Sequence, residues 1–341
     1  MTRIPHISLC PIAVDSFACD WSGSLPLQIV DSISVADVSN IVQETTFDIL
    51  SPMFYSKSEI DRLRSIRYAL LRRFECEDSE RPLEDEKSAD ALYRLYLGLK
   101  VIRPTAGAFQ VLHYDLSQTV PRLPRGSRNN RETIVSDCER LNAIRWKDLE
   151  ALAKFAPSIL ESLKTPSSPI AQAIQSLEIG YRADFVNVRH LLWVIGLDAL
   201  FTSIEWENRG ADVAVKRIEN FLGRGFEIYP KMESFGFPSL DKLTLGEVLT
   251  DVYEFRNNLA HGTWPNKPWA RKISRRSADG LDDIYYTTVL SESASSILRG
   301  CLKNIFAEEQ FVGMFNDKTK MNAYFAQRDL VRKRKAKATA T

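Results

Sequence analysis

Histidine and cysteine are scarce in this 341-residue chain, which contains four histidines and five cysteines. No CxxC pair and no Cys/His cluster is present, although a structural zinc site would need one. The cysteines are odd in number and widely spaced, which argues against a disulfide framework: Cys10, Cys19, Cys76, Cys138 and Cys301. The sequence therefore predicts a protein with no metal site and no cofactor.

Long apolar runs are also missing from the sequence. No stretch approaches the ~20 apolar residues that a membrane helix needs. The first residues, MTRIPHISLCPIAVDS, lack the continuous apolar run of a signal peptide. We therefore expect no association with a membrane and a cytoplasmic location.

The chain has no strong excess of one charge, because 45 basic and 44 acidic residues leave a net charge of +1. A general polyanion binder is therefore excluded, and any surface that binds nucleic acid must be local. P-loop, Rossmann, nucleophile-elbow and zinc-ligand motifs are absent as well. The candidate function must come from a different kind of motif.

Residues 165–169, TPSSP, are small, polar and bracketed by proline, which predicts a domain boundary. The predicted fold is mainly α. Residues 1–165 form a mostly α domain with a few short strands near its start, and residues 168–313 form a helical domain. Residues 326–341 are basic and lose their apolar residues, so we expect a frayed or disordered tail.

In the N-terminal half, apolar residues at helical spacing predict helices over residues 35–50, 58–74 and 89–102. The acidic segment 76–87 contains Pro82 and predicts a surface loop. Residues 106–117 are rich in aromatic and β-branched residues and predict a strand. Residues 135–163 predict a long helix or helix pair, broken near Pro157. The loop 121–132 carries four arginines and is interpreted as a solvated connector or a phosphate contact.

In the C-terminal half, Ser168 and Pro169 predict the start of a helix that runs to about residue 182. Further helices are expected over residues 185–204, over 211–222 with Gly223 as terminator, and within 284–311. The best-bounded helix lies in residues 244–265, where Thr244 and Glu247 form a predicted capping box. Gly262 and Pro265 end it. The apolar residues of this helix recur at helical spacing: Leu245, Val248, Leu249, Val252 and Leu259.

Two charged residues stand at positions where apolar ones are expected. Arg256 falls on the apolar stripe of the 244–265 helix, and Asp198 is the only charge within the apolar run LLWVIGLDALF. A charge buried alone is costly, so each is predicted to be the other's partner. One interpretation is a structural ion pair that only locks two core helices. The other is a functional site, because His261 in the last turn and Asn257 one turn before it lie close to Arg256.

The segment RNNLAH, residues 256–261, resembles the R-x4-H signature of HEPN domains, with the polar residue that the family prefers directly after the arginine. The upstream run HLLWVIGLDALF resembles the HEPN helix that carries an acidic residue, here Asp198, although glutamate is commoner in the family. The resemblance covers residues 168–313 and is closest to the ApeA-like HEPN proteins of prokaryotic defence systems. It implies a dimeric helical bundle and a metal-independent ribonuclease, acting in anti-phage defence or as a toxin.

The resemblance also implies a role for each site residue. His261 would transfer protons, Arg256 would bind the phosphate oxygens, Asn257 would orient the phosphate or the imidazole, and Asp198 would hold Arg256. Five residues place Arg256 and His261 about 140° apart around a helix axis, so a homodimer is expected to close the cleft. Weaker RNA contacts are expected from two basic segments, at Arg271, Lys272, Arg275, Arg276, Arg332, Lys333 and Arg334.

Three alternatives stay open from the sequence. Many HEPN domains bind RNA or partners without cleaving, so the helical half could be a binding or dimerisation module. The N-terminal half matches no motif and could be a sensor of a phage or regulatory trigger, or could itself be the working part. Thr263 stands where HEPN toxins with nucleotidyltransferase antitoxins usually carry a tyrosine, so control through modification of that tyrosine is not supported.

Overall fold

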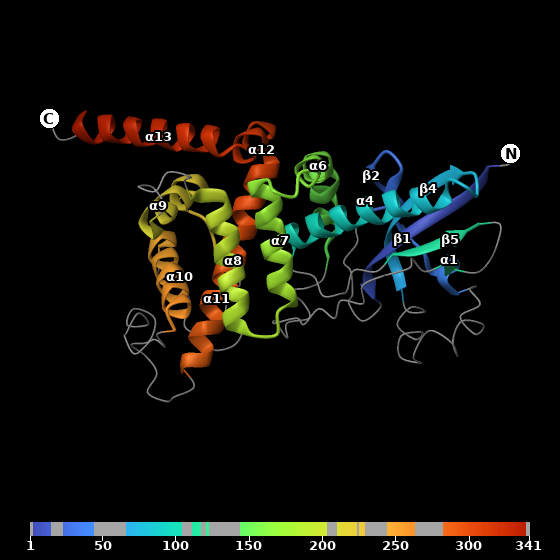
Figure 1. Cartoon of the computed structure of the whole chain (residues 1–341), viewed down its shortest axis with the longest axis horizontal. Coiled ribbons are helices and arrows are strands. Elements are labelled where there is room, and N and C mark those ends of the chain that lie inside the picture. The colour runs from blue at the N-terminus through green and yellow to red at the C-terminus, as the bar shows by residue number, and fades with distance from the viewer. Residues whose placement is uncertain are drawn as a thin grey trace. The chain divides into compact units, whose positions relative to one another are not determined.

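The computed structural model shows a mostly helical chain with one small antiparallel sheet (Figure 1). It describes residues 3–14, 23–43, 66–103, 111–116, 121–122, 144–202, 210–223, 225–228, 244–262 and 282–338. The chain divides into two compact units, Met1–Glu161 and Ser162–Thr341. The division falls just before the 165–169 segment that the sequence predicts as a boundary.

The first unit contains a six-stranded antiparallel sheet with the strand order β2-β3-β4-β1-β5-β6. One face of the sheet forms an apolar core from residues such as Leu9, Leu71 and Tyr114. The strands are β1 (Ile4–Val14), β2 (Leu27–Val30), β3 (Ile33–Asp37), β4 (Ile66–Cys76), β5 (Leu112–Asp115) and β6 (Pro121–Arg122). The strands expected near the start of the chain and within 106–117 are confirmed.

The predicted helix over residues 58–74 is wrong from residue 66 onward, because that part forms β4 in the middle of the sheet. Leu70 and Leu71 are adjacent in sequence and both buried, one on each face of the strand. Two buried neighbours in a strand covered on both faces resemble half of a helical apolar pattern. The 35–50 prediction is also wrong at its start, where β3 extends to Asp37 before the short helix α1 (Ser39–Gln43). Residues 44–65 lie outside the described ranges.

Helix α4 (Arg81–Ile102) confirms the 89–102 prediction and extends it toward the N-terminus, so the surface loop predicted over 76–87 is wrong from residue 81. Pro82 stands in the first turn, where a missing N–H costs no helical hydrogen bond. Helix α6 (Trp146–Ser162) continues through Pro157 and is not broken there. A Cβ atom on Gly98 of α4 would come within 2.6 Å of Ile159, so this glycine allows α4 and α6 to pack closely.

The second unit consists of helices, and the first four of them lie largely within their predicted boundaries. They are α7 (Pro169–Arg182), α8 (Val186–Phe201), α9 (Ala211–Leu222), α10 (Leu245–Ala260), α11 (Asp282–Ala307), α12 (Glu309–Phe315) and α13 (Lys318–Ala338). Ser168 caps α7 by accepting a hydrogen bond from the Ala171 N–H at 3.2 Å. Gly223 ends α9 with a φ of 83°, a conformation that favours glycine.

Helices α7 and α8 lie side by side and pack on α11 (Figure 1). The Trp193 indole of α8 lies against Gly180 of α7, where a Cβ atom would be 2.3 Å from Nε1, and it donates to the Leu177 carbonyl at 3.2 Å. Five apolar residues of α11 are buried: Ile297, Leu298, Leu302, Ile305 and Phe306. This core fixes α8, which carries Asp198.

The basic C-terminal segment is helical through Ala338, so the frayed or disordered tail predicted from residue 326 is wrong over most of its length. Lysine, arginine and alanine are all good helix formers, and charge alone does not prevent them from extending an existing helix. The segment begins on a packed helix, since Phe325 is buried against Phe201 and Phe315.

Candidate functional site

Helix α10 begins and ends as its sequence predicts. Both hydrogen bonds of the Thr244/Glu247 capping box are present, and Gly262 follows the helix with a φ of 65°. Leu245, Val248, Leu249 and Val252 are buried, whereas Leu259 is only half-buried. The apolar stripe therefore opens toward solvent in the last turns, where Arg256 and Asn257 are half-buried and His261 is exposed.

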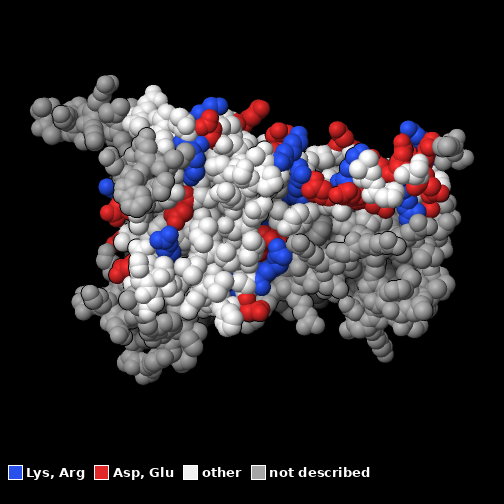
Figure 2. Space-filling model, in the orientation of Figure 1, with Lys and Arg blue, Asp and Glu red and all other residues white. Residues whose placement is uncertain are grey.

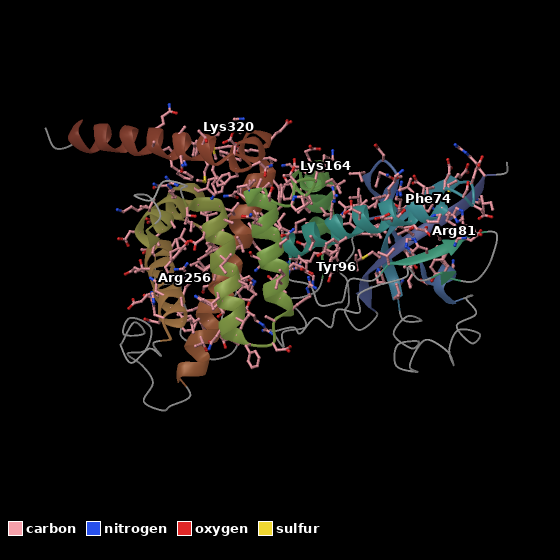
Figure 3. All side chains as sticks on the ribbon, viewed as in Figure 1. Phe74, Arg81, Tyr96, Lys164, Arg256 and Lys320 are labelled. Atoms are coloured by element: carbon pink, nitrogen blue, oxygen red, sulfur yellow. The ribbon has the colours of Figure 1, made fainter. Side chains whose placement is uncertain are left out.

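Asp198 and Arg256 form the ion pair that the sequence predicts. A carboxylate oxygen of Asp198 on α8 lies 3.4 Å from Nη2 of Arg256 on α10, and Figure 3 labels Arg256 there. The two side chains are partly accessible, at 23% for Asp198 and 37% for Arg256. The pair is thus more open than the sequence suggests, and the outer side of the guanidinium is available to a ligand.

Tyr253 also binds Asp198, and it was not identified from the sequence. Its hydroxyl donates to the second carboxylate oxygen of Asp198 at 3.0 Å, and its ring is buried. Burial raises the pKa of Asp198, while Tyr253, Arg256 and Lys318 oppose that rise. Burial and the neighbouring Asp198 carboxylate raise the pKa of Tyr253 well above its usual value, so the hydroxyl remains a donor. Its place three residues before Arg256, on the same helix face, is the signal that could have identified it.

Asn257 also binds the guanidinium of Arg256. The Asn257 side-chain oxygen accepts a hydrogen bond from Nη1 of Arg256 at 3.0 Å. With the carboxylate at Nη2 and the amide at Nη1, the guanidinium plane is fixed by two neighbours. A fixed planar cation with remaining N–H groups can bind an oxyanion through paired hydrogen bonds.

His261 is not joined to this cluster. It is the C-terminal capping residue of α10, and its backbone N–H donates to the Asn257 carbonyl at 3.0 Å. Its side chain is exposed and makes no hydrogen bond or ion pair to any residue within the described ranges. The structure therefore brings Asp198, Arg256 and Asn257 together and leaves His261 outside this group.

A second group of cations lies at the C-terminal end of α8 and was not foreseen. The Lys318 ammonium donates to the carbonyls of Ala199 and Thr202, the latter at 2.9 Å. Arg217 donates to the Phe201 carbonyl at 2.9 Å. Burial, with Arg217 nearby, lowers the pKa of Lys318 to about 8 although Asp198 favours its charged form. These side chains satisfy the last carbonyls of α8 and fix the helix end that positions Asp198.

His190 provides another connection between α8 and α10, at a buried position. Its Nε2 lies 2.9 Å from the Val252 carbonyl, and its ring packs edge-on against Phe255 at 4.6 Å between centroids. Burial lowers the pKa of His190 to about 4, so the imidazole is neutral near pH 7 and donates from Nε2. A histidine directly before the apolar run LLWVIGL was the available signal.

The remaining predicted RNA contacts are not described at the level of side chains. Arg271, Lys272, Arg275 and Arg276 lie outside the described residues, as does most of the arginine-rich 121–132 loop. Arg332, Lys333 and Arg334 are on α13, but their side chains are not described. Among the described residues, no three His, Cys, Asp or Glu side chains are grouped as metal ligands, and no helix has the length and apolar character needed to span a membrane.

The cluster around Arg256 has the chemistry of an anion receptor next to a titratable group. The guanidinium is permanently charged, is held by Asp198 and Asn257, and is accessible on one side. The exposed imidazole of His261 lies one turn further along the same helix. Comparisons with protein-family models, with curated proteins and with solved structures give no match.

Proposed function

We propose that the protein is a metal-independent endoribonuclease of the HEPN type, with the second unit as its HEPN helical bundle. The observation that carries the proposal is the fixed and accessible guanidinium of Arg256, held by Asp198 and Asn257 at the end of the helix that bears His261. A pair that served only to lock α8 to α10 would not need an accessible guanidinium. Partial exposure of both partners supports a receptor for a phosphate group.

In the proposed reaction, the 2′-hydroxyl of a ribose attacks the adjacent phosphorus and the bond from phosphorus to the 5′ oxygen breaks. His261 accepts the proton of the 2′-hydroxyl or supplies one to the leaving 5′ oxygen. Arg256 binds the non-bridging oxygens while negative charge increases on them. The products are a 2′,3′-cyclic phosphate and a 5′-hydroxyl. DNA has no 2′-hydroxyl and is not a substrate.

Two further elements belong to this proposal. His261 has no orienting partner within the described part of the chain, and we propose that a second copy of the helix positions it in a homodimer. The first unit is the sensor of a phage or regulatory trigger, and defence or toxin activity follows from RNA cleavage. The isolated position of His261 is also the observation that favours the second candidate, a HEPN module that binds RNA without cutting it.

The test compares purified wild-type protein with the variant His261→Ala on matched RNA and DNA strands. The wild type should cut only RNA and leave a 2′,3′-cyclic phosphate, with no loss of activity when a chelator is added. The variant should bind RNA as well as the wild type and cleave it ~10²–10⁴-fold more slowly, since a proton-transfer group is lost. Glu254→Ala is the matched control, because Glu254 is an exposed residue on the same helix.

Three results would contradict the ribonuclease. Cleavage that survives His261→Ala would remove the proposed proton transfer, and cleavage that stops with a chelator would indicate metal chemistry. RNA that is bound but never cut, even at high protein concentration, would favour the binding module.

A further inference from the structure

Tyr253 differs from the other side chains around Arg256 because it lies in the core. Tyr253 is 3% exposed, whereas Asp198, Arg256 and Asn257 are all partly accessible to solvent. A tyrosine side chain has few rotatable bonds, so a ring that is packed in a core places its hydroxyl at a fixed point. The Tyr253 hydroxyl is therefore a rigid reference point beside more mobile charged groups.

The Asp198 carboxylate divides its two oxygens between Tyr253 and Arg256. The Tyr253 hydroxyl donates to Oδ1 at 3.0 Å, and Nη2 of Arg256 donates to Oδ2 at 3.4 Å. The tyrosine contact is the shorter one, and 3.4 Å is long for a hydrogen bond between charged groups. The orientation of the carboxylate is therefore set more by the buried tyrosine than by the arginine.

Within the described ranges, Asp198 is the residue that joins Arg256 to another helix. Asn257 is the neighbour of Arg256 on α10, so its hydrogen bond does not fix the guanidinium relative to α8. Tyr253 and Arg256 are three residues apart on α10, about 60° around the axis, and both reach one carboxylate on α8. The direction of the guanidinium thus depends on a carboxylate that Tyr253 orients.

We infer that Tyr253 is a positioning residue of the candidate site, which orients Asp198 and, through it, directs the guanidinium of Arg256 toward the phosphate. Tyr253 is buried and does not contact the substrate. Its effect on cleavage rests on the proposed ribonuclease, whereas its effect on Asp198 can be measured without RNA.

The charges around Asp198 support this role. Figure 2 shows few charged side chains over α7 and α8, and the cations that act on Asp198 are Arg256 of α10 and Lys318 of α13. Burial raises the pKa of Asp198, and the hydrogen bond from Tyr253 opposes that rise more than either cation does. From α11, the buried Cys301 thiol faces Tyr253, and burial raises the pKa of this thiol well above its usual value, so it stays uncharged. Removal of the Tyr253 hydroxyl should therefore raise the pKa of Asp198 further.

The test is Tyr253→Phe, which removes the hydroxyl and keeps the ring in the core. On RNA, kcat should fall roughly tenfold while KM changes little, because the guanidinium acts on charge that develops in the transition state. A carbon-13 NMR titration of the full chain, labelled at its aspartate carboxyl groups, follows Asp198 directly, and Asp198→Asn identifies its signal. The midpoint should move up by about one pH unit, since a hydrogen bond to a charged group is lost.

Tyr181→Phe is the matched control. Tyr181 is on α7 in the same unit, its hydroxyl lies 3.1 Å from the Ser295 hydroxyl, and the charged groups that act on it are Arg299 and Glu292. This variant should leave kcat and the Asp198 midpoint unchanged, even if it lowers the melting temperature as much as Tyr253→Phe does.

A double variant tests the route of the effect. In the Asp198→Asn background, Tyr253→Phe should lower kcat no further, because Tyr253 acts through the carboxylate. A further loss of kcat would overturn the inference, since Tyr253 would then act by another route.

The remaining outcomes also decide the inference. It is overturned by a Tyr253→Phe variant that keeps the kcat of the wild type, whether or not the Asp198 midpoint moves, and by an equal loss of kcat in Tyr181→Phe. A wild-type chain that cuts no RNA contradicts the ribonuclease, and the titration then decides alone. A midpoint that moves in Tyr253→Phe but not in Tyr181→Phe supports the positioning of Asp198, and an unmoved midpoint overturns it. The two proposals therefore fail separately.

Discussion

Helices α8 and α10 contact each other at two polar places that differ in their access to solvent. At the first, His190 is fully buried, neutral near pH 7, and bonded to the Val252 carbonyl. At the second, Asp198 and Arg256 form a partly exposed ion pair, in which Asp198 also accepts a hydrogen bond from Tyr253 and Arg256 donates one to Asn257. The first place excludes any ligand, while the second leaves a cation accessible.

The comparison separates a residue that holds the fold from residues that can hold a ligand. The buried imidazole of His190 stabilises the fold through close packing and one hydrogen bond, and both interactions depend on the absence of water. The partly exposed Asp198–Arg256 pair contributes little to the stability of the fold, because solvent screens the attraction between the two charges. Both places join the same two helices, so their different roles can be measured against each other in one protein.

The largest expected effect is the loss of stability in His190→Ala. The substitution removes a ring packed against Phe255, leaves a cavity, and leaves the Val252 carbonyl without its donor. We expect a loss of about 3 kcal/mol, the order found when large side chains are removed from a core. Hydrogen exchange of the α8 and α10 amides in increasing denaturant measures it within the second unit. Glu254→Ala, at an exposed site on α10, should change stability by less than about 0.5 kcal/mol.

Lowering the pH from 7 to 5 should reduce the stability of the second unit by a smaller amount. The pKa of His190 is about 4 in the folded protein and 6.5 when it is unperturbed, so the unfolded chain binds a proton first as pH falls. The stability that His190 supplies is therefore complete above pH 6.5 and is lost toward pH 4. Between pH 7 and pH 5 the loss should be about 2 kcal/mol. The raised pKa of Asp198 acts in the opposite direction, because the folded protein holds that proton to higher pH.

The variant His190→Gln distinguishes these contributions. A glutamine amide can still donate to the Val252 carbonyl but does not titrate, so the pH dependence of α8 and α10 exchange should flatten between pH 7 and pH 5. An unchanged pH dependence in this variant would assign the effect to other groups and would remove His190 from the comparison.

The sequence predicts α10 and its neighbours because several local signals agree there. The Thr244/Glu247 capping box, Gly262 and the apolar spacing all indicate the same helix, and Ser168 and Gly223 do so for α7 and α9. The pairing of Asp198 with Arg256 was also predictable, since two unmatched charges on apolar helices have few other partners. The degree of exposure was not, because it depends on how α8 and α10 cross.

Strand β4 and two of the polar contacts between α8 and α10 were not predicted from the sequence, because they depend on contacts distant along the chain. Strand β4 exists because β1 and β3 pair with it on its two edges, and neither pairing is visible in the local pattern of residues 66–76. His190 and Tyr253 acquire their roles from Val252 and Asp198, on the facing helix. A single helix read alone shows that such a residue is polar, but not which group it meets.

The smallest stability effect should come from the Asp198–Arg256 pair, measured by a double-mutant cycle with Asp198→Asn and Arg256→Met. Arg256 is 37% exposed and Asp198 has Tyr253 as a second partner, so solvent and the remaining hydrogen bond limit the loss. We expect a coupling energy of no more than about 1 kcal/mol, as in other exposed pairs. The loss of a few kcal/mol that full burial of Asp198 would imply is therefore not expected.

RNA cleavage should be much more sensitive to the same variants than stability is. Arg256→Met removes the group that binds the phosphate oxygens and should abolish cleavage, whereas Asp198→Asn leaves Arg256 in place but less firmly held and should reduce cleavage by a smaller factor. The double variant should be nearly as stable as the wild type and inactive. A coupling energy near 3 kcal/mol, with cleavage that tracks stability across the variants, would show that the pair locks the two helices as His190 does. Such a result would mean that the His190 contact and the Asp198–Arg256 contact have the same role, because both would then stabilise the packing of α8 on α10.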